Sequence, residues 1–305
     1  ASHHTLSLLG DLQKAPCSLV ICDNGSEARH VESLRSHLQA SLTEMPGGGC
    51  PRGTQRRTLV LNACNSGFAA GMNLGIRELL EQSVDWIWLL NNDTRIAPDA
   101  LRTMLTAVEG LEPGFYGTGM QETESKNVSY GNLYNRWTTR YRPLREDGAV
   151  SARQGDWYPD GASMLIHREV FEKAGLLSED YFLYFEELDF KRRIHRLGFR
   201  PELLSEVTVQ HKQAGSSSQD FFAARRMYHE TLSTLRFYRK YHAFYLPVVL
   251  VFRTPARLVS LLFKGRFKEL GPVLRATVHF LSVRREHSAP PNVQGRHHFC
   301  THHAE

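Results

Sequence analysis

The 305-residue chain is long enough for one large α/β domain, or for a domain of roughly 200 residues with an extension. Its composition, 41% apolar and 23% charged, is that of a soluble globular protein. Five scattered cysteines without C-x-x-C spacing indicate reduced thiols rather than a disulfide framework or a zinc site. The sequence shows no signal peptide and no run of 18 apolar residues, so we expect no transmembrane helix.

The net charge of +5 is unevenly distributed along the chain. Residues 221–285 contain thirteen Lys and Arg side chains against two acidic ones, whereas residues 1–220 contain 23 basic and 28 acidic side chains. A basic block of this kind is typical of a surface that meets a polyanion, either nucleic acid or an anionic membrane.

The first predicted elements are a short helix over residues 5–14 and a strand over residues 18–22. The strand is a continuous apolar run, which is typical of a buried parallel strand. It ends at the turn Asp23-Asn-Gly-Ser, and a helix over residues 27–42 follows. Three glycines flanked by prolines at 46–51 predict a loop.

Two further strand–turn–helix units follow, with strands at 59–62 and 85–90 and helices at 70–82 and 98–109. This alternation predicts a parallel, doubly wound sheet, in which ligands bind outside the carboxyl ends of the strands. The polar stretch 121–155 is either a long loop or a small antiparallel hairpin over the site. The remaining predicted elements are an apolar segment at 161–166, helices at 168–174 and up to 198, a strand at 207–211, and basic helices beyond 219.

Polar residues collect at the ends of the first two predicted strands. The Asp23 carboxylate can accept hydrogen bonds from a nucleobase edge, although Asp-Asn-Gly is also ordinary turn chemistry. Between Asn65 and Asn73, two glycines allow close backbone approach, and a helix N-terminus offers N–H groups to a diphosphate. Many strand–helix loops need a glycine for structural reasons alone.

The third predicted strand delivers Asp93 to the edge of the sheet. Mg²⁺ typically takes one or two carboxylates together with phosphate oxygens, so a single Asp can anchor it. His211 ends the last predicted strand, where its imidazole can join Asp93 at the metal. The alternative for Asp93 is an ordinary helix-entry loop.

An acidic motif follows the aromatic run of residues 180–185 and contains Glu186, Glu187 and Asp189. Carboxylates held against an apolar wall have a raised pKa that suits a general base. The alternative is the acidic first turn of a solvated helix.

Taken in order, these motifs resemble glycosyltransferase family 2 over roughly residues 5–240. More narrowly, they resemble the rhamnosyltransferase-like members that build bacterial surface polysaccharides. The motifs are Asp23-Asn-Gly-Ser, Asn65-x-Gly-Phe-Ala-x-Gly-x-Asn73, Leu-Leu-Asn-Asn-Asp93-Thr, Asp160-Gly-Ala-Ser, Tyr-Phe-Leu-Tyr-Phe-Glu-Glu187-Leu-Asp and Val-x-His211.

The resemblance implies a GT-A, Rossmann-like α/β fold, with a mostly parallel sheet flanked by helices and a C-terminal helical extension. It also implies a nucleotide-diphosphate sugar donor, Mg²⁺ or Mn²⁺, and a single displacement with inversion. By motif position, Asp93 and His211 would bind the metal, and Glu187, with Glu186 as the alternative, would be the catalytic base. Donor-binding residues would be Asp23, Asn24, Asn65, Gly67, Gly71, Asn73 and Asn91, and acceptor-binding residues would be Trp157, Asp160 and Asp189.

The sequence departs from the family pattern at two places. Relatives open with an apolar strand ending in Thr-Tyr-Asn that contributes to the nucleotide pocket. The present sequence begins in the helix that follows this strand. The strand itself is therefore either absent or precedes Ala1. The usual Glu-Asp pair is Glu186-Glu187, which leaves the base open between the two.

We expect a catalytic domain over residues 1–220, a basic amphipathic helical extension over 221–286 and a loose tail over 287–305. The extension is typical of helices lying on anionic lipid, which predicts a cytoplasmic enzyme on the inner face of the cell membrane. Alternatively, these helices pack on the catalytic domain or on a second subunit, which would give a homodimer.

The expected acceptor is a glycan or a lipid-linked glycan. A nucleic-acid-binding protein is a rival reading, but the basic residues lack glycine-aromatic RNA motifs and the acidic front would repel phosphate, so no nucleic acid partner is expected. A non-catalytic scaffold with the same fold is the second rival. The sequence leaves the sugar, nucleotide, linkage and oligomeric state open.

Overall fold

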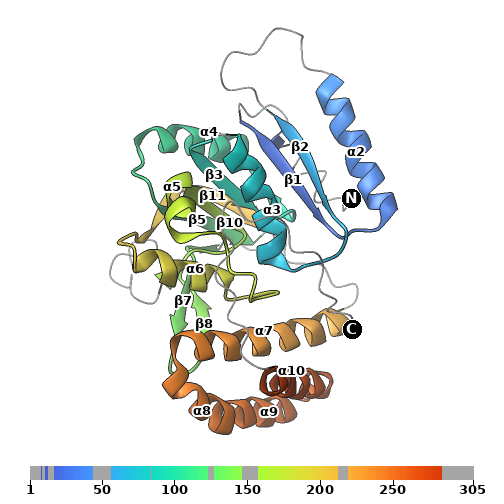
Figure 1. Ribbon diagram of the computed structural model, residues 1–305, viewed down its shortest axis with the longest axis vertical. Helices are drawn as coiled ribbons and strands as arrows, with labels where there is room; N and C mark the ends of the chain where they lie inside the picture. The colour runs from blue at the N-terminus through green and yellow to red at the C-terminus, as the bar shows by residue number, and fades with distance from the viewer. Residues whose placement is uncertain are drawn as a thin grey trace.

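The computed structural model describes residues 8, 11–12, 17–43, 56–82, 84–122, 127–145, 157–211 and 219–283 of an α/β protein (Figure 1). The strands are β1 (Leu19–Asn24), β2 (Arg57–Asn62), β3 (Trp86–Leu90), β4 (Thr94–Arg95), β5 (Phe115–Glu122), β6 (Val128–Ser129), β7 (Asn132–Asn135), β8 (Arg140–Pro143), β9 (Trp157–Tyr158), β10 (Ser163–His167) and β11 (Pro201–His211). The α-helices are α2 (Ala28–Thr43), α3 (Phe68–Glu81), α4 (Pro98–Ala107), α5 (Arg168–Ala174), α6 (Glu186–His195), α7 (Gln219–Tyr241), α8 (Leu246–Val248), α9 (Thr254–Phe263) and α10 (Leu270–Ser282).

The central sheet has the strand order β3-β10-β5-β11-β4, with β6 paired to β5, and β1 and β2 form a separate parallel pair. β5 and β11 run parallel, whereas β10 runs antiparallel to both β3 and β5. A parallel neighbour needs a crossover connection. The chain between β5 and β10 instead forms the β7–β8 hairpin, so β10 returns antiparallel. The alternation of predicted elements does not reveal this reversal.

The pairing of strands brings three distant segments to one edge of the sheet. Ser163 at the start of β10 pairs with Leu90 at the end of β3. The backbone N–H of Asn91 then donates to the carbonyl of Ala162 at 3.0 Å. At the other side of the sheet, His211 pairs with Thr94 in β4. The residues that follow β3, precede β10 and end β11 are therefore neighbours.

Apolar residues cover both faces of this sheet. One cluster, which includes Phe115, Phe171 and Phe190, packs α3, α5 and α6 on one face. A second cluster, which includes Met104 and Val209, lies under α4 on the other face, together with Leu8 and Leu12. Burial of apolar surface, at about 25 cal/mol per Å², is the main stabilising contribution of such layers.

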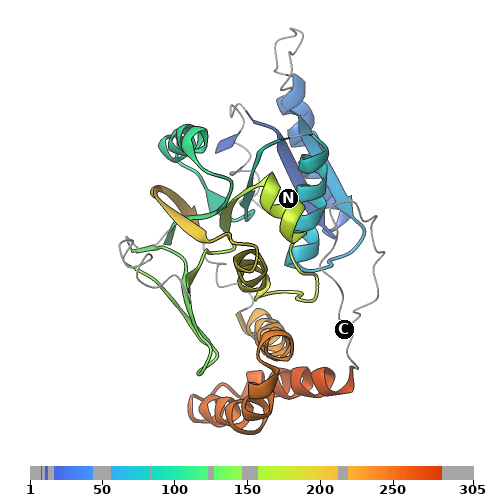
Figure 2. The ribbon, with the colours of Figure 1, turned by 60° about the vertical axis from the view of Figure 1, so that its left-hand side comes forward.

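The C-terminal helices form a layer beyond the sheet. α7 runs beside α6, and Phe237 and Tyr238 of α7 share a buried cluster with Tyr134 of the hairpin and Phe185. α8, α9 and α10 lie beyond α7, at the end of the molecule opposite β1 and β2 (Figures 1 and 2). α7 is therefore packed against the hairpin and α6, although it begins close to the expected boundary at residue 220.

Several predicted elements agree with the structure, but the longest unpredicted strand lies in the middle of the central sheet. Helix 168–174 coincides with α5, and the hairpin alternative for 121–155 corresponds to β7 and β8. The sequence did not predict β5, the strand between β10 and β11, because two glycines interrupt its apolar pattern. The predicted helix at 5–14 is described only at residues 8, 11 and 12, and the glycine loop near 46–51 lies outside the described residues.

Two expectations about the whole chain need correction. Cys64 is disulfide-bonded, so the prediction of reduced thiols is wrong for this residue, whereas Cys17 and Cys22 are free. In the described part of the chain, one helical stretch, Ala243–Phe263, is long and apolar enough to cross a membrane by length and composition, with a mean hydropathy of 1.6. The sequence predicts no such helix because it contains no run of 18 apolar residues, and Arg253 and Arg257 interrupt this stretch.

Candidate active site

The two residues before α6, which begins with the acidic motif, have an unusual backbone conformation. Tyr184 and Phe185 both have positive φ angles, 68° and 79°, which are uncommon for residues other than glycine. Packing of Phe185 against Tyr134 and Phe237 offsets this strain. Strained backbone of this kind occurs at functional sites when the surroundings enforce it. The turn fixes the direction in which the first residues of α6 point.

Glu187 lies in a cavity of about 180 Å³ between the hairpin, α6 and the start of β10. Its Oε1 is so close to Gly161 that a Cβ at this glycine would be 1.9 Å away. Burial, and after it the nearby Asp160 carboxylate, raise the pKa of Glu187 to about 7. A carboxyl with this pKa can accept a proton at neutral pH. The cavity is lined by Asn132, Tyr134, Tyr141, Tyr158, Asp160, Gly161, Tyr184, Phe185, Glu187 and Leu188.

The adjacent Glu186 is placed differently. It is 2% exposed and is not part of the cavity lining. Burial, together with the charge of Glu187, raises the pKa of Glu186 well above its ordinary value. Glu186 therefore has no open path to a substrate. The geometry favours Glu187 of the two candidates.

Asp93 and His211 face each other at the sheet edge, with 3.1 Å between Oδ1 and Nε2. The hydrogen bond to Asp93 raises the pKa of His211, and Asp160 and Glu122 add to this effect against the cost of burial. Asp160 thus influences both His211 and Glu187. The strand ends bring together the two residues expected to bind metal, next to the cavity of the expected base.

The chemistry of this pair fits a hard divalent cation. Ligands on adjacent vertices of an octahedron, each about 2.1 Å from Mg²⁺, lie about 3.0 Å apart, which is close to the separation of these two atoms. Among the described residues, no group of three or more His, Cys, Asp or Glu side chains could hold a metal alone. A cation here would therefore need further oxygens from a diphosphate or from water.

The ends of β1 and β2 form a turn that Asn24 holds together. Its amide Nδ2 donates to the Gly67 carbonyl at 2.8 Å, and its Oδ1 accepts from the Ser66 N–H at 3.1 Å. Gly67 has a φ of 94°, and a Cβ there would lie 2.5 Å from the Phe182 carbonyl. The turn therefore contacts the aromatic run that leads to Glu187. Asn65 is exposed beside it, and its Oδ1 caps the Gly67 N–H.

Other residues in the expected donor site have structural contacts. Asn73 is fully buried, and its amide bonds to both the N–H and the carbonyl of Leu177, so the expectation that it contacts the donor is wrong. A Cβ at Gly71 would lie 2.9 Å from Asn24 Nδ2, so this glycine allows the turn to pack on α3. Asp23 is 5% exposed and accepts from the Ser26 N–H at 3.0 Å. Asn91 is half-buried, and its carbonyl accepts from Thr94.

Two of the three expected acceptor-binding residues do not reach the cavity. Trp157 is fully buried and donates from its indole N–H to the Tyr130 carbonyl at 2.6 Å. Side chains alternate along a strand, so the next residue, Tyr158, lines the cavity instead. Asp160 does line the cavity, as expected. The acceptor role predicted for Trp157 is therefore wrong.

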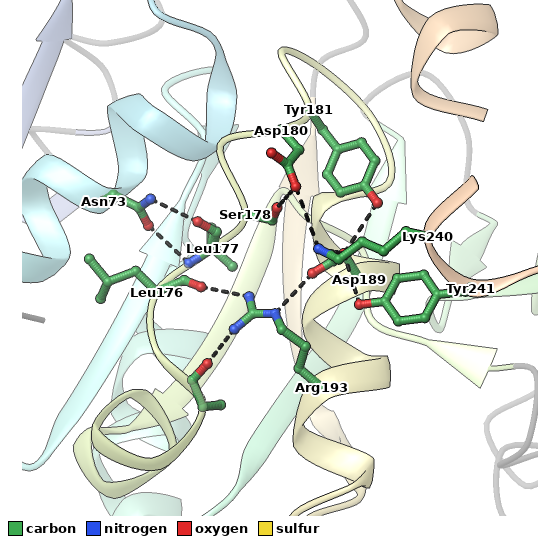
Figure 3. A network of polar contacts seen from close by, with 11 residues as sticks. Asn73, Leu176, Leu177, Ser178, Asp180, Tyr181, Asp189, Arg193, Lys240 and Tyr241 are labelled. Atoms are coloured by element: carbon green, nitrogen blue, oxygen red, sulfur yellow. Dashed lines mark hydrogen bonds and ion pairs between the residues drawn. The ribbon is translucent and has the colours of Figure 1, made fainter. Parts of the chain in front are cut away.

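The acceptor role predicted for Asp189 is also wrong. Asp189 is fully buried, and four donors surround its carboxylate (Figure 3). Arg193 Nε lies at 2.9 Å and Lys240 Nζ at 2.7 Å, and the hydroxyls of Tyr181 and Tyr241 lie at 3.1 and 2.9 Å. Asp189 therefore ties α6 to α7 and cannot contact an acceptor.

The residues that the sequence reading missed are mainly tyrosines of the cavity. Tyr134 and Tyr141 come from the hairpin, Tyr158 from β9 and Tyr184 from the strained turn. Tyrosines offer an apolar ring and a polar hydroxyl, which suits a ligand with both kinds of surface. Tyr184 belongs to the aromatic run that the sequence makes obvious, whereas the other three could be assigned only after the hairpin was placed.

Comparisons with known proteins agree with this geometry. The family model described as glycosyl transferase family 2 matches residues 5–175. An N-acetylglucosaminyl-diphospho-decaprenol L-rhamnosyltransferase of Mycobacterium tuberculosis is 23% identical over 242 residues, which cover 70% of this chain and 73% of that protein. The low-salt glycan biosynthesis hexosyltransferase Agl10 of Haloferax volcanii is 26% identical over 137 residues, covering 43% of this chain and 44% of Agl10.

A solved structure supports the fold. The mannosyltransferase PcManGT from Pyrobaculum calidifontis, in complex with GDP-Man and Mn²⁺, aligns with a TM-score of 0.53 at 11% identity, covering 92% of this chain and 84% of that one. The expected GT-A type of α/β fold with a C-terminal helical region is thereby confirmed. Because the family model spans more than half of the chain, the protein belongs to glycosyl transferase family 2 and is a rhamnosyltransferase-like glycosyltransferase.

Proposed function

We propose that this glycosyltransferase moves a sugar, with inversion, from a nucleotide-diphosphate donor to the hydroxyl of a lipid-linked glycan, and that Glu187 is the base. One observation carries this proposal. The Glu187 carboxylate lines the cavity, and its pKa is raised to about 7. A general base is most effective when its pKa lies near the working pH. Enough of it is then ionised, and the ionised form is still basic enough to remove the proton.

The reaction follows from this placement. The acceptor oxygen attacks the anomeric carbon, and its proton passes to the Glu187 carboxylate. The bond between the anomeric carbon and the donor's diphosphate oxygen breaks, and the diphosphate leaves with the electron pair. Tyr158 and Asp160 line the same cavity and would orient the acceptor.

Asp93 and His211 would hold the divalent cation, Mg²⁺ or Mn²⁺. When bound, the cation supplies a positive charge that stabilises the leaving diphosphate. Asn65 and the backbone at Gly67 would lie along the donor, with Asp23 and Asn91 at its margins. PcManGT contains Mn²⁺ together with its donor GDP-Man, which supports the same requirement here.

The relatives support the choice of substrates. The mycobacterial protein is named for transferring L-rhamnose to N-acetylglucosaminyl-diphospho-decaprenol. We therefore propose rhamnose as the first sugar to test, and a sugar linked to a long-chain lipid through a diphosphate as the acceptor. This assignment places the enzyme in polysaccharide synthesis, on the cytoplasmic side of the membrane.

A donor screen with Mn²⁺ or Mg²⁺ tests the activity, and calorimetry on Asp93→Ala tests the metal site. We expect Asp93→Ala to abolish metal-dependent binding of the nucleoside diphosphate while the melting temperature stays close to that of the wild type. Asp99→Ala, an exposed change on α4, is the control. Unchanged affinity in the presence of Mn²⁺ would contradict the metal assignment.

The outer face of the C-terminal helices supports attachment to a membrane surface. Large apolar side chains are exposed on it, and Lys264, Arg266, Lys268 and Arg275 are exposed beside them. Anionic lipids bind surfaces that combine apolar area with basic charge. The exposed apolar side chains are Phe244, Val248, Val251, Phe252, Val259, Leu262, Phe263, Phe267, Leu274, Val278 and Leu281.

Two contacts favour attachment in the plane of the membrane over spanning. Near the middle of the apolar stretch, Arg253 bonds to Thr139 of the hairpin, and Arg257 pairs with Glu230 of α7 at 2.9 Å. Placing this helix across a bilayer would either break these contacts or draw polar residues into hydrocarbon, which is costly. An in-plane orientation keeps both contacts and covers the apolar face.

Flotation with liposomes tests this placement. We expect binding to phosphatidylglycerol vesicles that weakens as salt is raised, and little binding to neutral vesicles, because each basic residue contributes about 1 kcal/mol near an anionic surface. Equal binding to both kinds of vesicle would contradict the predicted contribution of the basic residues to membrane binding. If the protein binds neither kind of vesicle and elutes as a dimer in size-exclusion chromatography, this face instead packs between subunits.

A further inference from the structure

A group of arginines lies between the Glu187 cavity and the apolar outer face. Arg253 and Arg257 line a narrow crevice together with Thr139, Thr231, Thr234 and Thr254. The hairpin connects this crevice to the cavity, because Thr139 belongs to the crevice whereas Tyr134 and Tyr141, on the same hairpin, belong to the cavity. The crevice and the cavity are therefore neighbouring parts of one surface.

Arg226 extends this group toward the cavity. It is exposed on α7, four residues before Glu230, so both side chains lie on the same face of the helix. Burial raises the pKa values of Tyr141 and Tyr184, and the positive charge of Arg226 opposes this rise, so Arg226 lies close to both cavity tyrosines. Glu230 in turn pairs with Arg257 in the crevice.

The positive charge of this group exceeds the negative charge that the described residues bring to it. Among the described residues, the carboxylate that forms an ion pair with one of these arginines is Glu230, and its partner is Arg257. Arg253 is half-buried and bonds to the neutral Thr139. Burial lowers the pKa of Arg253, and the neighbouring Arg257 and Arg140 lower it further. A half-buried cation without a matching carboxylate, as Arg253 is, favours an anionic ligand, and arginines with nearby hydroxyls suit phosphate oxygens.

We propose that Arg226, Arg253 and Arg257 bind the diphosphate of a lipid-linked acceptor whose terminal sugar occupies the Glu187 cavity. This assignment rests on the proposed function. It is supported by the order in which the cavity, the arginines and the exposed apolar residues follow one another. The cavity holds the sugar, the arginines follow it, and Val251 and Phe252 are exposed next to Arg253, where a lipid chain would continue. The donor's diphosphate instead faces Asp93 and His211 at the sheet edge.

The test compares two acceptors in the double variant Arg226→Gln/Arg253→Gln. One acceptor is an isoprenyl-diphosphate-linked sugar, and the other is the same sugar as a neutral alkyl glycoside. For the diphosphate-linked acceptor, we expect KM to rise roughly tenfold or more for each arginine, the usual effect of losing a hydrogen bond to a charged group. KM for the alkyl glycoside should stay unchanged. Arg102→Gln on α4, also exposed, is the control. An unchanged ratio of the two KM values would overturn the proposal.

Calorimetry separates this proposal from the proposed function, because it needs no turnover. Geranyl diphosphate should bind the wild type and lose affinity in the double variant, whereas a nucleoside diphosphate with Mn²⁺ should bind both equally. If the nucleoside diphosphate loses as much affinity, the arginines serve the donor and the proposal is wrong. Geranyl diphosphate binding that depends on the arginines, in a protein that transfers no sugar, would support this site while contradicting the proposed function.

Discussion

Two carboxylates on the same helix, two residues apart, have opposite surroundings. Glu187 lies in a cavity beside Gly161 and Asp160, where burial and a like charge raise its pKa to about 7. Asp189 lies at the junction of α6 and α7, where Arg193, Lys240 and two tyrosine hydroxyls surround it. The cavity raises the pKa of one carboxylate, whereas the junction surrounds the other with hydrogen-bond donors. Function and stability are therefore divided between neighbouring residues.

Glu187→Gln should have the largest effect on activity. The glutamine keeps the shape and removes the base, so turnover should fall by roughly 10²–10⁴-fold while donor affinity stays close to the wild-type value. The folded-state pKa of Glu187 is raised, so this residue costs stability as the pH rises from its ordinary value through about 7. The variant should therefore be as stable as the wild type at about pH 4, below the ordinary pKa, and more stable at about pH 8, which thermal melts can measure.

Glu186→Gln is the matched control for this change. Glu186 is buried and lies outside the cavity lining, so its conversion to the amide should change turnover much less. If Glu186→Gln is the inactive variant and Glu187→Gln remains active, the two roles must be exchanged.

Asp189→Ala should have the largest effect on stability. It leaves Arg193 and Lys240 without their buried partner, so the free energy of unfolding should fall by about 3–5 kcal/mol. Urea unfolding measures this loss. The control is Glu172→Ala, which removes an exposed pair with Arg168 at the same i,i+4 spacing and should cost about 0–1 kcal/mol. Similar losses in both variants would show that the junction is not what holds α6 in place.

Gly161→Ala should displace the Glu187 carboxylate in the cavity without changing the stability of the protein much. The added methyl would lie 1.9 Å from Glu187 Oε1, so the carboxylate must move away. Because the end of a flexible side chain moves at little cost, the melting temperature should change little. Turnover should fall by roughly 10²-fold, since a displacement of about 1 Å can cost that much. Gly110→Ala, which meets no atom within 4 Å, is the control, and equal turnover in the two variants would contradict the position assigned to Glu187.

The sequence predicts most of the layered fold and part of the site. Apolar runs ending in polar turns predict β1, β2 and β3, and the sheet edge predicts that Asp93 and His211 meet. Contacts between distant segments decide the rest. Asn73 bonds to Leu177, 104 residues away, so nothing local separates a ligand-binding amide from a buried one. The choice between Glu186 and Glu187 likewise depends on the left-handed turn at Tyr184 and Phe185, which the packing of α7 and the hairpin enforces.

The most direct test of the central claim is the pH dependence of kcat/KM for the acceptor at saturating donor. Because Glu187 must be ionised to accept the proton, the rate should rise tenfold per pH unit below about 7 and level off above it. Asp160→Asn removes the neighbouring charge and should move this limb to lower pH. A wild-type limb near the ordinary glutamate pKa of about 4.3, or a rate that does not vary with pH between about 5 and 8, would contradict the assignment of Glu187 as the base.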